Sequence, residues 1–166
     1  EGRATLTTAG GRREVRGLNL SLGENRIAGD LVLDERFLPL GTIDFQLPDV
    51  GALAALALET VNGDLNGTIT FSDEAGKPRL AMNATTKSLA RGDVTAAGVT
   101  INATVSDYIA APSVSGRVQA ATVTSGNTVV KAVDVTLTPQ QGWTGFDGGA
   151  TVSDIPLRAA GRVQVA

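Results

Sequence analysis

Two carboxylate doublets are the residues of this sequence best suited to acid–base chemistry. Asp34–Glu35 and Asp73–Glu74 each place two acids side by side. Paired carboxylates act as general acid and base when burial or a neighbouring charge shifts one pKa. Both doublets, however, fall within turn-forming segments, "DERFLPLG" (34–41) and "SDEAGKP" (72–78). Acids in such turns are solvated, so the sequence predicts turn residues here and no catalytic pair.

The residue types required by most other catalytic mechanisms are absent. The chain has no cysteine and no histidine, which excludes disulfides, Cys/His zinc sites and mechanisms that use a histidine base or a cysteine nucleophile. No stretch resembles a phosphate-binding loop or a nucleophile elbow. We therefore expect a protein that is not an enzyme and that uses no cofactor and no metal ion.

Three short motifs have a structural interpretation as well as a functional one. "GFDGGATVSD" (145–154) is faintly similar to glycine–aspartate calcium loops, but it lacks their tandem repeat, so turn chemistry is predicted. "NAT" at 83–85 and 102–104 fits a glycosylation acceptor, although asparagines in strands serve equally as polar-face residues. "RGD" at 91–93 matches an adhesion tripeptide, for which a plain turn is the prediction.

The charge and composition of the chain argue against a nucleic-acid partner and against a membrane-spanning helix. The 166 residues include 14 Lys and Arg against 17 Asp and Glu, a net charge of −3, and only 4% aromatics. A nucleic-acid-binding surface needs a dense basic patch, so no nucleic-acid partner is expected. No run of about 18 apolar residues predicts a membrane-spanning helix, and the first residues lack the apolar middle of a signal peptide. We expect residues 1–166 to form one segment of a longer protein.

Two-residue alternation dominates the chain and predicts strands. In "NGDLNGTITF" (62–71), Leu65, Gly67, Ile69 and Phe71 fall on one side, and polar residues fall on the other. The same pattern recurs between turn signals at 22–25, 34–41, 72–78, 91–93, 106–113, 124–127 and 138–143. Strands at this spacing predict an all-β fold of about a dozen strands, either a sandwich, a barrel or an open sheet.

One helix is predicted within the all-β pattern. "PDVGALAALALET" (48–60) places Val50, Leu53, Leu56 and Ala57 on one helical stripe, with Asp49 as the capping residue. The helix should cover one end of the β core.

The apolar side of the strands allows two architectures. In a β-sandwich, two such faces pack about 10 Å apart and exclude everything else. In an open, curved sheet, the face stays uncovered because its cargo is itself apolar, and slim aliphatic side chains leave room for that cargo. Gly29, Gly67 and Gly116 sit on the apolar side, where they either mark bends of the sheet or leave width for cargo.

Residues 48–85, "PDVGALAALALETVNGDLNGTITFSDEAGKPRLAMNAT", resemble the TamB family of AsmA-like proteins from the envelopes of diderm bacteria. The shared pattern is a short helix after Asp49, an alternating strand with paired glycines, a Gly-x-Pro turn at 76–78 and a further strand from Arg79. "LSLGENRIAGDLVL" (20–33) fits the family's strand–turn–strand pattern with a central glycine. The resemblance is clearest from about 15 to 105.

The resemblance implies a β-taco, an elongated U-shaped open sheet around a hydrophobic groove, about 55 Å long for a dozen strands at ~4.8 Å spacing. The groove would shield phospholipid acyl chains crossing the periplasm between the inner and outer membranes; the alternative is a chaperone or template for outer-membrane β-barrel proteins. The full-length protein would be anchored in the inner membrane by a segment outside these residues and would bind a TamA-like outer-membrane barrel.

The residues expected to line the groove share the apolar side of the alternation. They are Leu18, Leu20, Leu31, Leu33, Ile43, Phe45, Leu65, Ile69, Phe71, Leu80, Met82, Ile101, Val105, Val118, Val133 and Val135. Their expected role is passive solvation of hydrophobic cargo.

Overall fold

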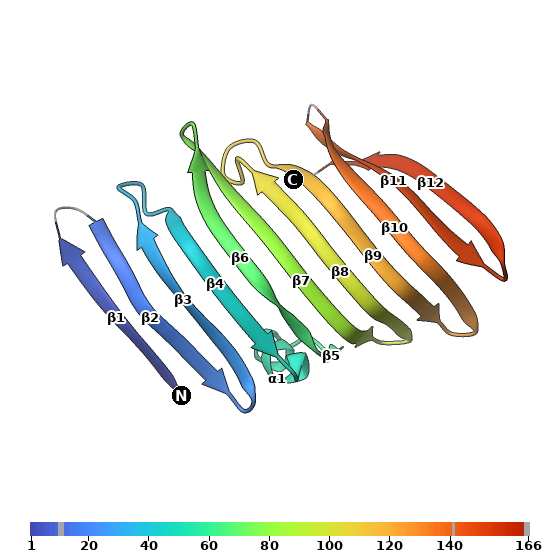
Figure 1. The fold of residues 1–166 in the computed structure, drawn as a ribbon, viewed down its shortest axis with the longest axis horizontal. Coiled ribbons are helices and arrows are strands. Elements are labelled where there is room, and N and C mark those ends of the chain that lie inside the picture. The colour runs from blue at the N-terminus through green and yellow to red at the C-terminus, as the bar shows by residue number, and fades with distance from the viewer. Residues whose placement is uncertain (10–11, 141, 165–166) are drawn as a thin grey trace.

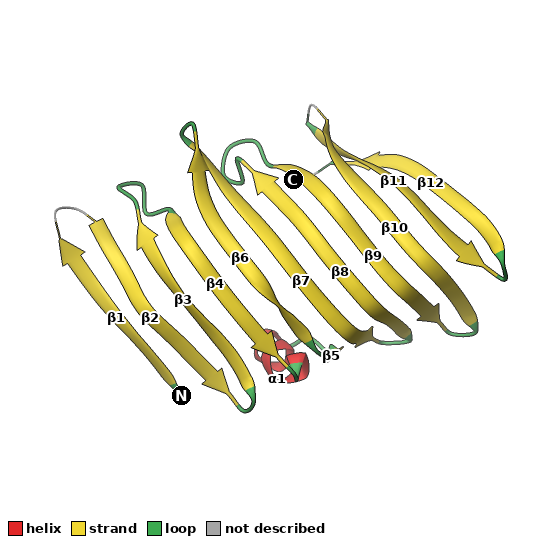
Figure 2. Ribbon diagram, viewed as in Figure 1, coloured by secondary structure: helices red, strands yellow, loops and turns green. Residues whose placement is uncertain are grey.

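The protein is a single open antiparallel sheet with one short helix (Figures 1 and 2). The structure is a computed structural model that describes residues 1–9, 12–140 and 142–164. Its strands are β1 (Gly2–Ala9), β2 (Arg12–Leu22), β3 (Asn25–Leu33), β4 (Pro39–Leu47), β5 (Asn62–Gly63), β6 (Leu65–Glu74), β7 (Lys77–Arg91), β8 (Val94–Ser106), β9 (Ser113–Ser125), β10 (Thr128–Gln140), β11 (Trp143–Val152) and β12 (Ile155–Val163). No helix in the described ranges is long and apolar enough to cross a membrane.

The strands follow one another across the sheet in chain order. Neighbouring strands from β1 to β12 pair antiparallel in sequence order, and the segment that contains the helix connects β4 to β6. The two-residue strand β5 pairs with β7 beside β6. The all-β prediction is confirmed, because the described residues form an open sheet of 12 strands that does not close on itself. The alternative of a β-sandwich is wrong, because within the described part of the chain no second sheet packs on the first.

The register gives the sheet one apolar and one polar face. Directly paired residues of neighbouring strands share a face. The ladder connects Ile27, Phe45, Gly67, Ala84 and Ile101 across five adjacent strands. Because side chains alternate along each strand, the apolar positions predicted from the sequence gather on this face.

Two bulges keep the apolar residues on one face where strict alternation fails. In β2, the apolar positions Val15 and Leu18 are three residues apart, and the pairing with β3 shifts between them. Gly17 absorbs the extra residue at φ 60°, and its N–H donates to Asp30 Oδ1 at 2.7 Å. A similar shift in β10 lies beside Ala132 at φ 50°. Each bulge adds a residue without turning the following side chains to the wrong face.

The helix is shorter than predicted. Helix α1 spans Val50–Ala54 and continues as a 3₁₀ turn, η1 (Ala55–Ala57), instead of filling 48–60. Val50 and Leu53 pack against the sheet. The prediction for Leu56 is wrong, since its side chain is 75% exposed, because the change to 3₁₀ winding rotates it off the packed stripe. The side chain of Ala57 lies outside the described part.

Asp49 is not a side-chain cap, contrary to the sequence prediction. Its carboxylate makes no capping hydrogen bond. The chain is instead held at this point by Asn25, which is only 2% exposed. Asn25 Nδ2 donates to the Asp49 carbonyl at 2.7 Å, and the Asp49 N–H donates to Asn25 Oδ1 at 3.1 Å. One buried amide of the β2–β3 hairpin therefore fixes where the helix begins.

The connections form two margins of the sheet (Figure 1). The loop margin comprises the connections at 34–38, 75–76 and 107–112 together with residue 142. The helix margin comprises the helix and the turns at 23–24, 92–93, 126–127 and 153–154. Turns were predicted at all of these places, including 153–154, which lie in the "GFDGGATVSD" segment (145–154). The prediction of turn chemistry for "GFDGGATVSD" is wrong for residues 145–152, which belong to β11, because small residues are tolerated in a twisted strand near the end of the sheet.

Candidate functional site

The residues predicted to line a groove all lie on the apolar face. Those of β2 and β3 are Leu18, Leu20, Leu31 and Leu33, those of β4, β6 and β7 are Ile43, Phe45, Leu65, Ile69, Phe71, Leu80 and Met82, and those of β8, β9 and β10 are Ile101, Val105, Val118, Val133 and Val135. The register thus brings together residues that are far apart in the sequence. Their contact with cargo stays a prediction.

Most of this face is not covered by protein. A compact protein of 16.9 kDa exposes roughly 7,700 Å², whereas this chain exposes 10475 Å². The excess arises because a single-layered sheet has no second layer to bury its apolar side. Leu20, Leu6, Ile155 and Leu157 are all between 43% and 67% exposed, so the face is most open near the two edge strands.

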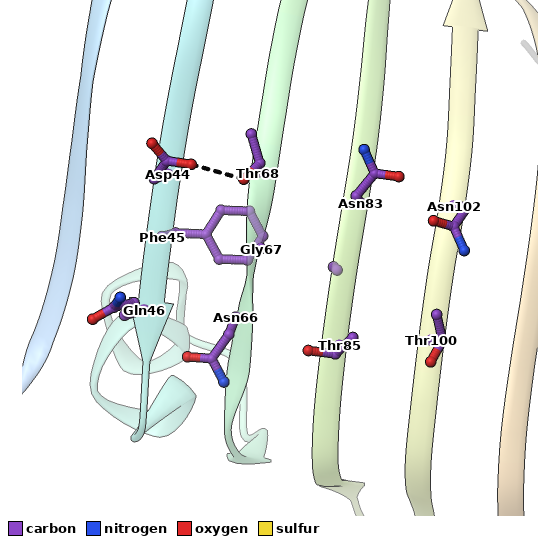
Figure 3. A pocket seen from close by; sticks show the side chains of 11 residues that line it. Asp44, Phe45, Gln46, Asn66, Gly67, Thr68, Asn83, Thr85, Thr100 and Asn102 are labelled. Atoms are coloured by element: carbon purple, nitrogen blue, oxygen red, sulfur yellow. Dashed lines mark hydrogen bonds between the residues drawn. The ribbon is translucent and has the colours of Figure 1, made fainter.

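Among the described residues, a small closed core lies beneath the helix. Phe45, Leu47 and Ala84 are buried there, with Val50 and Leu53 packed against them. The Phe45 ring lies over Gly67 (Figure 3), where a Cβ would come within 2.8 Å of Phe45 Cζ and 2.2 Å of the Asn83 carbonyl oxygen. Gly67 therefore leaves no width for cargo, because the aromatic ring occupies the space above it.

A second region of the apolar face is hollow. Near β10–β12, a depression of about 380 Å³ is lined by Val133, Val135, Phe146 and Leu157, with Gly148, Ala150 and Ala159 among its small residues. The small side chains set the depth of the depression, and the branched and aromatic ones form its walls. Apart from Arg158, which also contributes to the lining, these side chains offer dispersion contacts to an apolar ligand.

The opposite face is polar and also hollow. Asp44, Asn66, Thr68, Asn83 and Asn102 line a shallow depression of about 570 Å³ across β4–β8 (Figure 3). The Thr68 hydroxyl donates to Asp44 Oδ1 at 2.7 Å. Asn83 and Asn102 of the two "NAT" motifs pair directly across β7 and β8, which places both on the polar face, as their structural interpretation predicted.

The two carboxylate doublets form a structural network at the loop margin. Arg36 Nε donates to Asp34 Oδ2 at 3.1 Å, and its other nitrogens donate to Asp73 and, at 3.0 Å, to the Gly76 carbonyl. Asp34 also accepts the Leu38 N–H at 2.8 Å. This backbone hydrogen bond, and then the bonds from Arg36, hold the pKa of Asp34 below its usual value. Asp34 and Glu35 lie in the loop after β3, as predicted, whereas Asp73 and Glu74 form the end of β6, so the turn prediction is wrong for the second doublet. Arg36 ties the two segments together.

Asp64 has a comparable role at the helix margin. Its carboxylate accepts the Lys87 N–H at 3.0 Å and the Ser88 N–H at 3.1 Å. Asp64 lies between β5 and β6, where neither strand pairs with β7. Its carboxylate therefore accepts the hydrogen bonds of two β7 N–H groups that a main-chain carbonyl would accept in a regular ladder. The Lys87 N–H is the main cause of the lowered pKa of Asp64. The polar side of the alternation around residue 64 was predicted, but not this repair of the ladder.

Unsatisfied polar atoms concentrate at the loop margin. Within the part of the chain that the structure describes, three buried side-chain atoms lack a hydrogen-bond partner: Arg79 Nε, the Tyr108 hydroxyl and the Thr144 hydroxyl. Burial raises the pKa of Tyr108. All three residues lie at or next to the loops of this margin, which therefore has hydrogen-bonding capacity that the chain itself does not use.

Arg13 and Phe37 form a feature that sequence reasoning missed. The Arg13 guanidinium lies 4.1 Å from the centroid of the Phe37 ring. The two residues are 24 positions apart, and only the β2–β3 pairing and the following loop bring them together. No local pattern in the sequence could have revealed the contact.

Comparison with models of protein families, with curated proteins and with solved structures gave no match to this chain. Among residues 1–9, 12–140 and 142–164, no three acidic side chains lie close enough together to hold a metal ion. The open apolar face is therefore the feature from which a function has to be argued.

Proposed function

We propose that this chain is a segment of a periplasmic hydrophobic conduit of the TamB type, which shields phospholipid acyl chains during transport between the inner and outer membranes. The observation that supports this proposal most directly is the apolar face, which no second layer covers in the described residues and whose central positions in β3–β10 carry no charged side chain. In this role the segment performs no chemistry and needs no cofactor.

The energetics favour a lipid as the ligand of such a face. Each methylene exposed to water costs about 0.8 kcal/mol, so a phospholipid with two sixteen-carbon tails would cost on the order of 25 kcal/mol to solvate. A continuous apolar surface offsets that cost at each position along the route. The depression between Val133 and Leu157 offers a hollow of about 380 Å³ for an acyl chain on this face.

The proposal includes the rest of the parent protein. A membrane anchor outside these residues would hold the protein at the inner membrane, and a TamA-like barrel would be its outer-membrane partner. Together these would place the segment in the periplasm of a Gram-negative bacterium.

A second candidate function is a chaperone or template for strands of outer-membrane β-barrel proteins. The observation that favours it is the edge strand β12, in which every residue is exposed. An exposed edge offers unpaired main-chain groups to an incoming strand.

The two functions can be separated with photo-crosslinking side chains on the two faces. A crosslinker at Val135 should capture phospholipid, and one at Thr136, the next residue on the polar face, should not. Capture of nascent barrel strands by a crosslinker at Arg158, on β12, would favour the template instead. Equal lipid capture at Val135 and Thr136 would contradict the conduit.

A charged substitution tests the same surface without a probe. Val135→Asp should abolish lipid capture while the chain still folds, and Thr136→Asp is the matched control on the polar face. If Val135→Asp unfolds the chain and Thr136→Asp does not, the apolar face is a closed core and the proposal fails.

A further inference from the structure

One positively charged residue near the loop margin, Arg13, lies on the apolar face of the sheet. Arg13 pairs with Leu33 across β2 and β3, so its side chain starts from the same face as Leu18, Leu31 and Leu33. Among the described residues, Arg13 has no ion-pair partner within 4 Å, whereas Arg36 nearby binds both Asp34 and Asp73. Arg13 is therefore a half-buried cation at the border of an apolar surface with its charge uncompensated by a direct contact.

The ring beneath Arg13 is held in a costly conformation. Phe37 has φ 63°, in the left-handed region that bulky residues seldom adopt. Its N–H donates to the Asp34 carbonyl at 3.0 Å, and the Asp34–Arg36 network fixes the loop on both sides of it. Phe37 nevertheless stays 60% exposed. Strain that the surroundings maintain at an exposed residue is characteristic of a functional position.

Stacking leaves the hydrogen-bonding groups of Arg13 available. The guanidinium lies 4.1 Å from the centroid of the Phe37 ring, and a cation–π contact of this kind does not use the N–H groups as hydrogen-bond donors to an oxygen. An in-plane fork of donors matches two oxygens of a phosphate group. The geometry therefore suits a phosphodiester that approaches from the edge of the apolar face.

The two margins differ in a way that orients a lipid. At the helix margin, the cation Arg91 is bound to Glu59 at 2.8 Å, and helix α1 covers part of the apolar face at this side. The acids Asp34 and Asp73 of the loop margin are both bound by Arg36. This margin also has Arg13, which has no such partner among the described residues, and the three unsatisfied polar atoms.

We propose that the Arg13–Phe37 pair binds the headgroup phosphate of a phospholipid whose acyl chains lie on the apolar face. Headgroups follow the loop margin, and the chains point toward the helix margin. This inference rests on the proposed function, which it deepens by assigning the orientation of the lipid.

The experiment compares two soluble lipids that differ only in the headgroup. Dioctanoylphosphatidylglycerol has a phosphate, and dioctanoylglycerol has none. Binding of each to the 166-residue chain is measured by native mass spectrometry and by calorimetric titration. Arg13→Gln should weaken binding of the phosphatidylglycerol by about tenfold or more, since a charge-assisted hydrogen bond is lost, and should leave dioctanoylglycerol unchanged.

Arg162→Gln is the matched control. Arg162 is also stacked on an aromatic ring, with its guanidinium 4.8 Å from the centroid of Trp143, but its pairing with Gly145 places it on the polar face. This variant should bind both lipids as the unmodified chain does. In the unmodified chain, raising NaCl from about 50 mM to about 500 mM should weaken only the phosphatidylglycerol, because screening acts on the charged headgroup.

The possible outcomes separate a failure of the headgroup site from a failure of the conduit. If Arg13→Gln binds both lipids normally, or loses both equally, the headgroup site is refuted while the conduit stands. If the unmodified chain binds neither lipid, the conduit itself is refuted. If Arg13→Gln does not fold, the salt dependence decides, and equal sensitivity of both lipids to NaCl overturns the site.

Discussion

Replacing Phe45 by alanine tests where this molecule has a true core. Phe45 is 6% exposed, lies over Gly67 and contacts the patch beneath helix α1. Burial of a phenylalanine in a closed core is worth about 3–5 kcal/mol in a Phe→Ala substitution. We expect a loss near this range, because removal of the ring exposes the backbone of Gly67 and leaves Val50 and Leu53 without a surface to pack on.

The matched control is the same chemical change at an exposed site. Phe37 is 60% exposed and contacts Arg13 by stacking, an interaction worth about 0.5–1 kcal/mol at exposed positions. Phe37→Ala should therefore lower the free energy of unfolding by about 1 kcal/mol or less. Phe146, on the apolar face in the depression near β12, is expected to give an intermediate value.

Urea unfolding followed by far-UV circular dichroism measures the three values on the same scale. Hydrogen exchange then locates the effect, which should be concentrated in β4, β6 and the helix for Phe45→Ala. If Phe45→Ala and Phe146→Ala are equally destabilising, the apolar face is packed uniformly in solution. The reasoning that separates a closed patch from an open surface would then be refuted.

Three further predictions concern the polar groups and glycines that hold the sheet in shape. Asn25→Ala should lower stability by about 2 kcal/mol, because it leaves the Asp49 N–H and carbonyl unpaired in a buried place; faster hydrogen exchange in the helix would confirm it, and unchanged exchange would contradict it. Because the pKa of Asp64 is lowered in the folded state, chiefly by the Lys87 N–H, its stabilising effect is present above its unfolded pKa of about 3.9 and is lost as the pH falls through the lower folded value. Asp64→Asn should therefore flatten the acid limb of the stability–pH curve, and an unaltered limb would show that the carboxylate has no such role. Gly67→Ala should destabilise the chain at every pH, because the new methyl group would overlap a main-chain oxygen of the next strand and the ring above it; a neutral result in urea unfolding would refute that.

The all-β fold could be predicted from the sequence because the signal is local and repeated. Side-chain alternation such as Leu65–Gly67–Ile69–Phe71 depends only on the two-residue period of a strand, and turn residues punctuate it at each hairpin. Chain-order topology then follows, since consecutive strands pair when the connections are short. The bounds of the helix could not be predicted, because a buried amide of another hairpin, Asn25, sets where it begins.

The apolar face was predicted in outline, but its details depend on tertiary contacts. The sequence places Gly67 on the apolar side without showing that Phe45 fills the space above it. It places Asp34 and Asp73 in turns without showing that one arginine joins them. The Arg13–Phe37 contact depends on a strained backbone angle that no residue pattern encodes, since phenylalanine is not a residue that favours positive φ.

The bulge at Gly17 shows that the open face is a constraint on the whole sheet. The three-residue spacing from Val15 to Leu18 would turn one half of β2 to the polar side in a regular strand. The glycine, at φ 60°, and the bond from its N–H to Asp30 correct this at the cost of a regular ladder. A similar correction recurs at Ala132 in β10, where alanine must adopt a left-handed angle that it disfavours. Without the two bulges, Leu18 and Leu20 of β2 and Val133 and Val135 of β10 would turn to the polar face, so both irregularities serve to maintain an apolar surface that the chain itself largely leaves uncovered.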